Sequence, residues 1–254
     1  MTAAPALELH GLTKSFGEVA AVRAVRLSVP AGAFLGLVGP NGAGKTTLLS
    51  MAVGLLRPDA GTARVLGADV WAGRDRDRAK ELLGVQPQGL ALPPRLTGRE
   101  LLTYLGRLRD LPAALVDQRT DELLTVLDLD SADRTLVGDY STGMRKKLAL
   151  AAALLHGPRV LVLDEPFEAV DPVSAATVRA ILDGFVASGG TVVMSSHVMV
   201  LVEQLCDRVA VLDSGRLLRE GTLDQVRGTQ RLEDAFAALV GRDAPARGLS
   251  WFGS

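Results

Sequence analysis

A glycine-rich segment followed by a lysine and two threonines is the clearest chemical feature of the sequence. Residues 39–47 match the pattern G-x-x-x-x-G-K-[ST], in which backbone N–H groups surround a phosphate chain at the positive end of a helix. Lys45 adds a full charge there, and Thr46 offers a hydroxyl to Mg²⁺. A tight strand–helix turn that merely needs glycine is the alternative. The predicted phosphate-binding residues are Gly39, Pro40, Asn41, Gly42, Ala43, Gly44, Lys45, Thr46 and Thr47.

Two adjacent acids, Asp164 and Glu165, follow the apolar run at 160–163. A buried strand should not end in paired carboxylates unless something compensates their charge, and Mg²⁺ beside a phosphate loop would do so. Successive strand residues point in opposite directions, so the two acids can have different roles. We expect Asp164 to hold the metal through a water and Glu165 to act as the general base. Taken alone, the pair would equally well cap the next helix.

The elements that must position these residues are strands alternating with helices. Apolar runs predict buried strands at 34–38, 160–163, 191–194 and 209–212. Residues 22–29 alternate between apolar and polar, which predicts a half-buried strand, and residues 7–10 can pair with it. A helix is predicted at 45–53. Alternation of this kind favours a mostly parallel sheet covered on both faces. From about residue 97 to 157 the sequence shows helical patterns instead, at 97–109, 113–127 and from 141 to 155. The fold class is therefore α/β with an inserted helical subdomain.

Composition indicates a soluble globular protein and excludes several classes. The chain has 254 residues, of which 48% are hydrophobic and 22% charged, and the formal net charge is −1. A general electrostatic attraction to nucleic acid is therefore not expected. The single cysteine excludes an internal disulfide and fits a reducing compartment. We see no export signal and no run of apolar residues long enough for a membrane span.

Further short motifs occur in one order along the chain. They are K-S-F-G at 14–17, Q-P-Q at 86–88, Y-S-T-G-M at 140–144, E-A-V-D at 168–171 and S-H at 196–197. With the two motifs above, they make the chain resemble the nucleotide-binding subunit of ATP-binding cassette (ABC) transporters from about residue 7 to 240. The motif at 140–144 discriminates best, because other phosphate-loop ATPases lack it. The resemblance implies a phosphate-loop NTPase core, an N-terminal antiparallel β-subdomain and the helical insertion within a single domain, 1–240.

The resemblance also implies roles for residues outside the phosphate loop. Phe16 matches the aromatic that stacks on adenine, although an aromatic at the edge of the core is the alternative. Gln88 is expected at Mg²⁺ or water, with Gln86 as its competitor, and His197 at the γ-phosphate and the catalytic water. The catalytic set is thus Glu165, His197 and Gln88, and the metal set is Thr46, Gln88 and Asp164. In the family, the loop that matches Ser141, Thr142 and Gly143 reaches the γ-phosphate bound by the opposite subunit, and Asp171 belongs to the adjoining D-loop.

The chain departs from the family pattern in its signature loop. The commonest form is L-S-G-G-Q, and Met144 cannot make the hydrogen bonds of that glutamine. The Y-S-x-G-M form is similar to that of exporter subunits whose permease is a separate polypeptide, commonly exporters of drugs or natural products. Ser141 can also serve as a plain helix N-cap. We expect Arg145-Lys146-Lys147 to be a solvated helix face, with contact to phosphate or a partner as the alternative.

The resulting prediction is an ATPase that binds ATP and Mg²⁺, dimerises with a second copy or a paralogue, and drives a separate transmembrane permease from the inner face of the plasma membrane. The permease should dock between residues 88 and 109, where Leu90, Leu92, Leu96 and Leu101 lie. Residues 241–254 should form a mobile tail, whose Trp251-Phe252 pair could instead dock on a partner. The alternatives are an ABC ATPase of DNA repair or translation, a phosphate-loop kinase or GTPase, and a nucleotide-binding regulator that does not hydrolyse.

Overall fold

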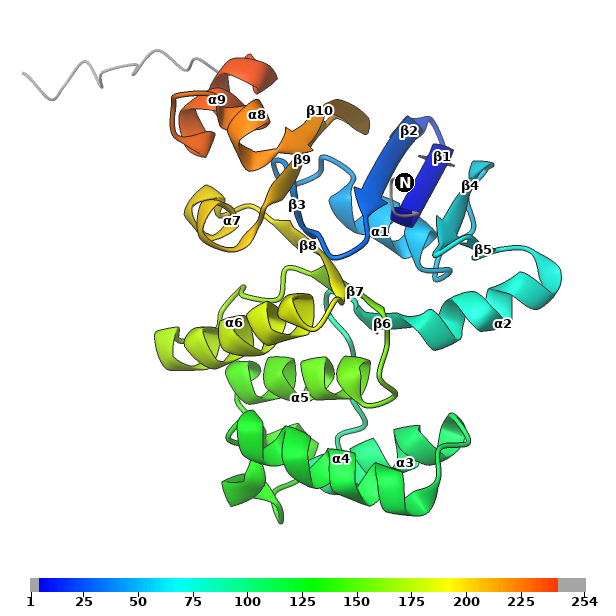
Figure 1. The fold of residues 1–254 in the computed structure, drawn as a ribbon, viewed down its shortest axis with the longest axis vertical. Coiled ribbons are helices and arrows are strands. Elements are labelled where there is room, and N and C mark those ends of the chain that lie inside the picture. The colour runs from blue at the N-terminus through cyan, green and yellow to red at the C-terminus, as the bar shows by residue number, and fades with distance from the viewer. Residues whose placement is uncertain (1–4, 242–254) are drawn as a thin grey trace, which may run out of the picture.

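A six-stranded sheet forms the centre of the computed structural model, which describes residues 5–241 (Figure 1). Its strand order is β10-β9-β3-β8-β7-β6, and all neighbours are parallel except the edge pair β10 and β9. The strands are β3 (Phe34–Val38), β6 (Leu83–Gln86), β7 (Val160–Asp164), β8 (Thr191–Ser196), β9 (Arg208–Asp213) and β10 (Arg216–Thr222). The prediction of a mostly parallel sheet is confirmed.

A second, antiparallel sheet of four strands contains the N-terminal part of the chain. Its order is β2-β1-β4-β5, with β1 (Pro5–Phe16), β2 (Val19–Pro30), β4 (Ala60–Val65) and β5 (Ala68–Asp69). This confirms the antiparallel β-subdomain that the family resemblance implied. Neither β4 nor β5 is predicted from the sequence, because neither shows a clear alternation of apolar and polar residues.

The helices complete the layers on both sides of the central sheet. They are α1 (Lys45–Ala52), α2 (Gly73–Leu82), α3 (Gly98–Leu108), α4 (Ala113–Val126), α5 (Thr142–Leu154), α6 (Pro172–Ala187), α7 (Met199–Leu205), α8 (Leu223–Arg227) and α9 (Leu232–Val240). Helices α1 and α3–α5 begin within two residues of the positions that the sequence predicted. By contrast α2 covers the run of alternating charges at 74–78, which a hydrophobic-periodicity argument cannot recognise as a helix.

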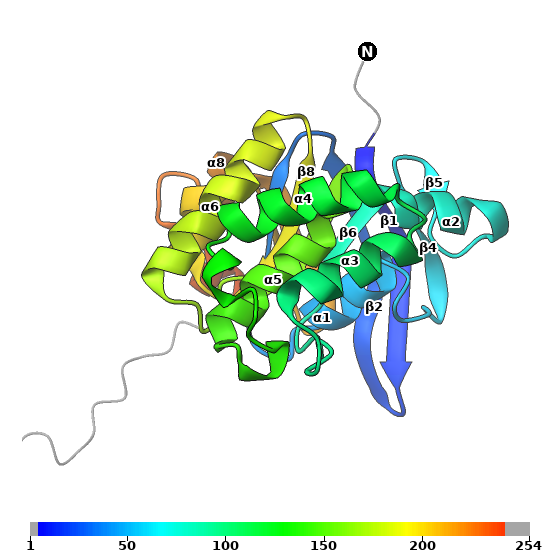
Figure 2. The ribbon, with the colours of Figure 1, turned by 90° about the horizontal axis from the view of Figure 1, so that it is seen from below.

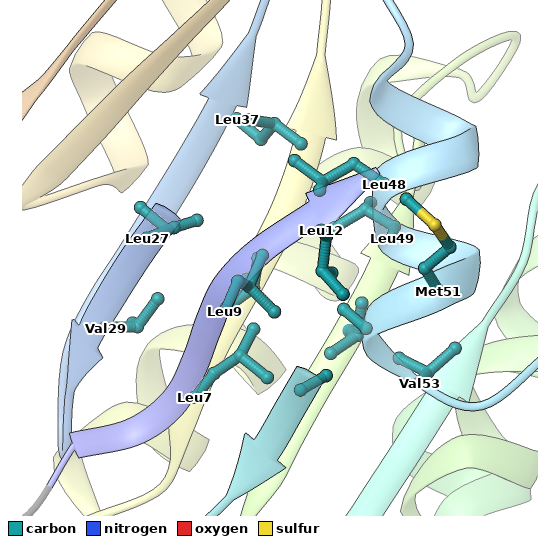
Figure 3. Packing of buried hydrophobic residues seen from close by; sticks show 14 of the residues in the cluster. Leu7, Leu9, Leu12, Leu27, Val29, Leu37, Leu48, Leu49, Met51 and Val53 are labelled. Carbon is teal, nitrogen blue, oxygen red and sulfur yellow. The ribbon is translucent and has the colours of Figure 1, made fainter. Parts of the chain in front are cut away.

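Two hydrophobic cores lie on the two faces of the central sheet. Strand β3 contributes to both, because its side chains alternate: Leu35 and Leu37 pack on one side, and Phe34 and Val38 on the other. The first core joins β3 to α1 and the antiparallel sheet, as the packing of Leu37 near Leu48 illustrates (Figure 3). The second core joins the sheet to α5, α6 and α7. The position of the phosphate-loop segment is thus set by packing on both faces.

Residues 97–157 form a helical region at one end of the long axis of the molecule (Figures 1 and 2). Helix α3 begins with a capping box in which Thr97 and Glu100 exchange side-chain–backbone hydrogen bonds of 3.2 and 2.8 Å. Helix α5 begins where the Ser141 hydroxyl accepts a hydrogen bond from the N–H of Met144, at 3.1 Å. The only β-type pairing within these residues is one isolated bridge, Thr97 to Leu136.

Several surface predictions are wrong. Leu101 is 2% exposed in the second core, and Leu92 and Leu96 also pack against it, so of the four leucines only Leu90 is an exposed docking candidate. The charges after Ser141 do not form one solvated face, because Lys147 is buried and Lys146 half-buried. The reason is that α5 lies between the sheet and the rest of the helical region, so that it has little free surface (Figure 1).

Two expectations concern residues at the end of the chain. Apart from Gly241, the expected mobile tail 241–254 lies outside the described residues, and so do Trp251 and Phe252.

Between residues 5 and 241, none of the helices has the length and apolar character needed to cross a lipid bilayer.

His156 joins the helical region to the central sheet and should make stability depend on pH. Its Nε2 lies 2.9 Å from the carbonyl oxygen of Leu83. Burial lowers the pKa of His156 to about 4, and the positive charges of Arg109 and Arg119 contribute in the same direction. Between pH 6.5 and 4 the unfolded chain therefore binds more protons than the folded one, so stability is lost as pH falls through this window.

We expect His156→Gln, which keeps a donor near Leu83 but does not titrate, to reduce this pH dependence. From the shift alone, the wild-type free energy of unfolding should fall by up to about 2 kcal/mol more than that of the variant between about pH 7 and pH 5. Partial exposure of the ring reduces that figure. Urea unfolding at both pH values measures it. Equal losses of stability in the two proteins would contradict the assignment.

Candidate nucleotide-binding site

Four neighbouring parallel strands end at one edge of the central sheet, and each is followed by predicted site residues. Their order is β3, β8, β7 and β6. The phosphate loop follows β3, His197 follows β8, Glu165 follows β7, and Gln88 lies two residues beyond β6. Because the strands are parallel, segments far apart in the sequence are brought together at this edge.

These segments surround a cavity of about 420 Å³. It is lined by Ala21, Asn41, Gly42, Ala43, Gly44, Lys45, Thr46, Thr47, Gln88, Glu165, Glu168 and His197. Ten of these twelve residues were predicted from the sequence, and Ala21 and Glu168 were not. The structure thus brings together most of the predicted phosphate-binding and catalytic residues.

The phosphate loop has a backbone that requires glycine at two positions. Gly42 and Gly44 have φ angles of +80° and +100°, which side-chain-bearing residues rarely adopt. A Cβ atom on Gly44 would also lie 2.4 Å from the carbonyl oxygen of Ala21. The Lys45 ammonium donates hydrogen bonds to the carbonyl oxygens of Gly39, at 2.7 Å, and Pro40, at 3.3 Å. Gly39 and Pro40 thus hold the Lys45 side chain through their carbonyl oxygens, and they do not line the cavity.

Glu165 is the most constrained carboxylate of the site. It is 7% exposed and has a φ of +48°, an uncommon conformation for a residue other than glycine. Its Oε2 lies 3.0 Å from His197 Nδ1, and its Oε1 lies 3.8 Å from the Lys45 ammonium. Because a carboxylate only accepts hydrogen bonds, His197 Nδ1 carries the proton in this contact.

Asp164 is held by the neighbouring strand rather than by the cavity wall. Its Oδ1 accepts a hydrogen bond from the Ser195 hydroxyl, and that hydroxyl in turn accepts the backbone N–H of Glu165 at 2.8 Å. Asp164 is 5% exposed and does not line the main cavity, although it borders two smaller ones beside it.

The oxygen atoms at one side of the cavity suit a hard divalent cation. Thr46 Oγ1 and Gln88 Oε1 lie 3.4 Å apart. Mg²⁺ takes oxygen ligands and keeps several waters, so it needs few protein groups. No cluster of three or more His, Cys, Asp or Glu side chains suited to a metal occurs among residues 5–241. The residues present therefore fit a cation that is shared with a phosphate chain, rather than one held by the protein alone.

The signature-loop residues lie outside this cavity. Ser141 and Thr142 are exposed at the start of α5, and a Cβ added to Gly143 would lie 3.4 Å from Asp171 Oδ2. Asp171 is the N-cap of α6, and hydrogen bonds from the backbone and then the side chain of Ser174 lower its pKa. Ser141, Gly143 and Asp171 thus form one group at two helix N-termini, and none of them lines the cavity of the chain's own phosphate loop.

Phe16 also lies outside the cavity lining. Its ring ends β1, is 52% exposed, and has the Lys14 ammonium 5.8 Å from its centroid. Such exposure does not fit the alternative of a core-edge aromatic and leaves the ring face available for stacking. Met144, the departure from the family signature, packs partly buried against the second core.

Sequence reasoning missed two polar residues of the site. Glu168 lines the cavity, and its Oε2 accepts a hydrogen bond from Gln88 Nε2 at 3.3 Å. Lys146 of α5 donates to the backbone oxygen of Glu165 and lies 3.8 Å from Glu168. The signal for Glu168 was its place in the E-A-V-D motif that also contains Asp171, whereas nothing in the sequence distinguished Lys146 from its charged neighbours.

A phosphate loop at the end of a parallel strand, beside strand-end acids and a strand-end histidine, defines a phosphate-loop NTPase. The family model of ABC transporters matches residues 22–168. The chain is 39% identical over 224 residues to the daunorubicin/doxorubicin resistance ATP-binding protein DrrA of Streptomyces peucetius, covering 88% of this chain and 67% of that protein. It is 37% identical over 242 residues to the Nod factor export ATP-binding protein I of Ralstonia nicotianae, covering 95% of this chain and 74% of that one.

Two solved structures are similar to most of the described fold. One is the ATP-binding subunit of an ABC transporter, with a TM-score of 0.85 and 26% identity, covering 92% of this chain and 99% of that one. The other is a dimeric ATP-binding cassette in a post-hydrolysis state with ADP and phosphate, with a TM-score of 0.78 and 25% identity, covering 85% and 98%. The chain belongs to the ABC transporter family, as an ATP-binding subunit that hydrolyses ATP.

We expect Lys45→Ala to weaken ATP binding at least about tenfold, because it removes a charged donor from the phosphate loop. Isothermal titration of ATP measures the change. Lys80→Ala is the matched control, because Lys80 is an exposed lysine of α2 outside the cavity lining. Equal ATP affinity in the Lys45 and Lys80 variants would show that the loop does not bind the phosphates.

Proposed function

We propose that this chain is the ATPase subunit of an exporter, that it works as a head-to-tail dimer on a separate membrane permease, and that it hydrolyses ATP with Mg²⁺. The observation that carries the proposal is the contact of Glu165 with His197 and Lys45 at the edge of the phosphate-loop cavity. A motor of this kind needs a site that distinguishes ATP from ADP, and these three side chains would do so by contacting the γ-phosphate and the attacking water.

Glu165 is the proposed general base. Water attacks the γ-phosphorus of ATP, the bond from that phosphorus to the bridging oxygen breaks, and Glu165 accepts the proton that the water loses. His197 holds the carboxylate in place through the 3.0 Å contact of its Nδ1. When bound, Mg²⁺ would be held by Thr46, Gln88 and, through water, Asp164, and would neutralise charge on the phosphates. Lys45 supplies the positive charge at the β- and γ-phosphates.

A second subunit is proposed because part of the predicted site does not face the cavity. Ser141 and Thr142 are exposed, and with Gly143 and Asp171 they occur together at two helix N-termini, which suit an anion. Two copies, or one copy and a paralogue, would each place this group on the γ-phosphate that the other binds. Phe16 would stack on the adenine of its own subunit. The similar dimeric cassette with ADP and phosphate supports this arrangement.

Hydrolysis would open the dimer, because a ligand shifts an equilibrium only by its differential affinity for the two states. The contact between the γ-phosphate and the opposite Ser141 exists only while that phosphate is attached. Its loss removes what favours the closed form. This alternation would be the mechanical output of the subunit.

The export assignment rests on the relatives. DrrA is named for resistance to daunorubicin and doxorubicin, and the other relative for Nod factor export. The Y-S-T-G-M form of the signature points to the same class. We therefore propose drug-like or natural-product cargo that the permease, rather than this chain, selects. Neither relative is named as a DNA-repair or translation ATPase, and the net charge of −1 gives no reason to expect a nucleic acid as partner.

The permease would dock on the surface between residues 88 and 109, and this docking would hold the subunit at the cytoplasmic face of the plasma membrane. Leu90, Tyr104 and Leu108 are exposed large apolar residues there, at 43%, 52% and 62%. They follow Gln88 or lie on α3, so a permease seated on them would move with the segment that reaches the nucleotide cavity.

We expect Glu165→Gln to bind ATP, to hydrolyse it at least about a hundredfold more slowly, and to accumulate as a dimer. The amide keeps the shape of the side chain but cannot accept a proton. Phosphate release and size-exclusion chromatography with light scattering measure the two effects. Persistence of a monomer with ATP and Mg²⁺ would reject the dimer mechanism.

We expect Leu90→Glu or Tyr104→Glu to lower co-purification with the permease by about tenfold or more, because a charge would be buried in an apolar contact. Leu218→Glu is the control, since Leu218 is an exposed leucine of β10 at the other end of the molecule from α3 (Figure 1). If the Leu90 and Tyr104 variants both co-purify with the permease as well as the wild type does, this docking surface is excluded.

A further inference from the structure

Glu168 lines two neighbouring cavities and contacts Gln88 and Lys146, which belong to two other segments of the chain. It lies in the loop between β7 and α6, and it lines both the nucleotide cavity and a neighbouring cavity of about 360 Å³. Gln88 is shared by both cavities, whereas Lys146 lines the second alone. One carboxylate therefore connects the segment after β6, the loop after β7 and the first turns of α5.

The contact with Gln88 determines which way its amide points. An amide has an oxygen end that accepts and a nitrogen end that donates, whereas an ionised carboxylate only accepts. Gln88 Nε2 donates to Glu168 Oε2 at 3.3 Å, so its oxygen end must point elsewhere. It faces Thr46 Oγ1 at 3.4 Å. That is the end a hard cation requires, because Mg²⁺ and Mn²⁺ bind amide oxygens and not amide nitrogens.

Lys146 holds Glu168 in this position from the side of α5. Its ammonium lies 3.8 Å from Glu168 Oε2 and donates to the backbone oxygen of Glu165. Burial lowers the pKa of Lys146, but the negative charges of Glu168, Glu165 and Asp164 favour its charged form.

We propose that Glu168 is a positioning residue for the divalent cation: it binds the nitrogen end of Gln88 and thereby presents the oxygen end to the metal beside Thr46. A residue without a side-chain acceptor at this position, such as alanine, would not impose this direction on the amide. The inference rests on the proposed function, since it assumes that Gln88 contacts the cation.

The test measures metal binding rather than turnover. Mn²⁺ is titrated into the purified chain saturated with ATP and followed by electron paramagnetic resonance, and ATP binding is measured separately in EDTA. The variants are Glu168→Ala, Glu168→Gln, Gln88→Ala and the double variant Gln88→Ala with Glu168→Ala. Glu81→Ala, an exposed glutamate of α2, is the matched control, and melting temperatures confirm folding.

We expect Glu168→Ala to weaken Mn²⁺ binding about three- to tenfold, in the range of one lost hydrogen bond, without weakening ATP binding in EDTA. Glu168→Gln should stay within about twofold of the wild type, because its amide oxygen can accept the same N–H. In the Gln88→Ala background, Glu168→Ala should have no further effect, since a residue that acts only through another shows complete coupling in a double-mutant cycle.

Three results would overturn the inference. One is an equal loss from Glu168→Ala with and without Gln88, which would indicate a direct effect of charge on the cation. Another is a loss from Glu168→Gln as large as that from Glu168→Ala. The third is unchanged Mn²⁺ affinity in Glu168→Ala while Gln88→Ala weakens it, which leaves the proposed function intact. If instead Gln88→Ala has no effect on Mn²⁺ affinity, the assumed role of Gln88 in the proposed function fails as well.

Discussion

The parallel alignment of β3, β8, β7 and β6 is the constraint on which the rest of the structure depends. Each strand contributes one chemical group at the same edge: the phosphate loop, His197, Glu165 and Gln88. A parallel arrangement requires crossover connections, and these are the helices that cover both faces of the sheet. The two hydrophobic cores on the two faces of β3 therefore stabilise the site as well as the fold.

Charge compensation explains why three ionisable groups can be buried at this edge. Lys45, Asp164 and Glu165 are each less than a tenth exposed. Lys45 donates to two carbonyl oxygens and lies near Glu165, while Asp164 accepts a hydroxyl from the adjacent strand. A buried charge without such partners would be expensive. The unusual φ of Glu165 belongs to the same arrangement, since strained residues concentrate where surrounding contacts determine their position.

Polar contacts, rather than apolar packing alone, connect the helical region to the nucleotide site. Lys146 of α5 reaches the backbone of Glu165 and the carboxylate of Glu168, and Gln88 approaches Glu168 from the opposite side. Polar contacts of this kind are directional, and they exchange partners more readily than a close-packed core. Under the proposed function, such a junction between the two regions would pass nucleotide-dependent changes from the site to the helical region.

The sequence by itself determined the α/β class, the phosphate loop, the strand-end acids and the helix N-cap at Ser141, because each depends on neighbouring residues and local periodicity. It did not reveal several elements with short or weak apolar patterns, among them β4, β5, β6, β10 and α2, nor the burial of Leu101 and Lys147. Only the tertiary structure decided that Gln88, Glu168 and Lys146 meet. Gln88 follows β6, Glu168 follows β7 and Lys146 lies in α5, so their contacts join three segments that are distant in the sequence. The order of strands in a sheet is set by global packing rather than by local sequence.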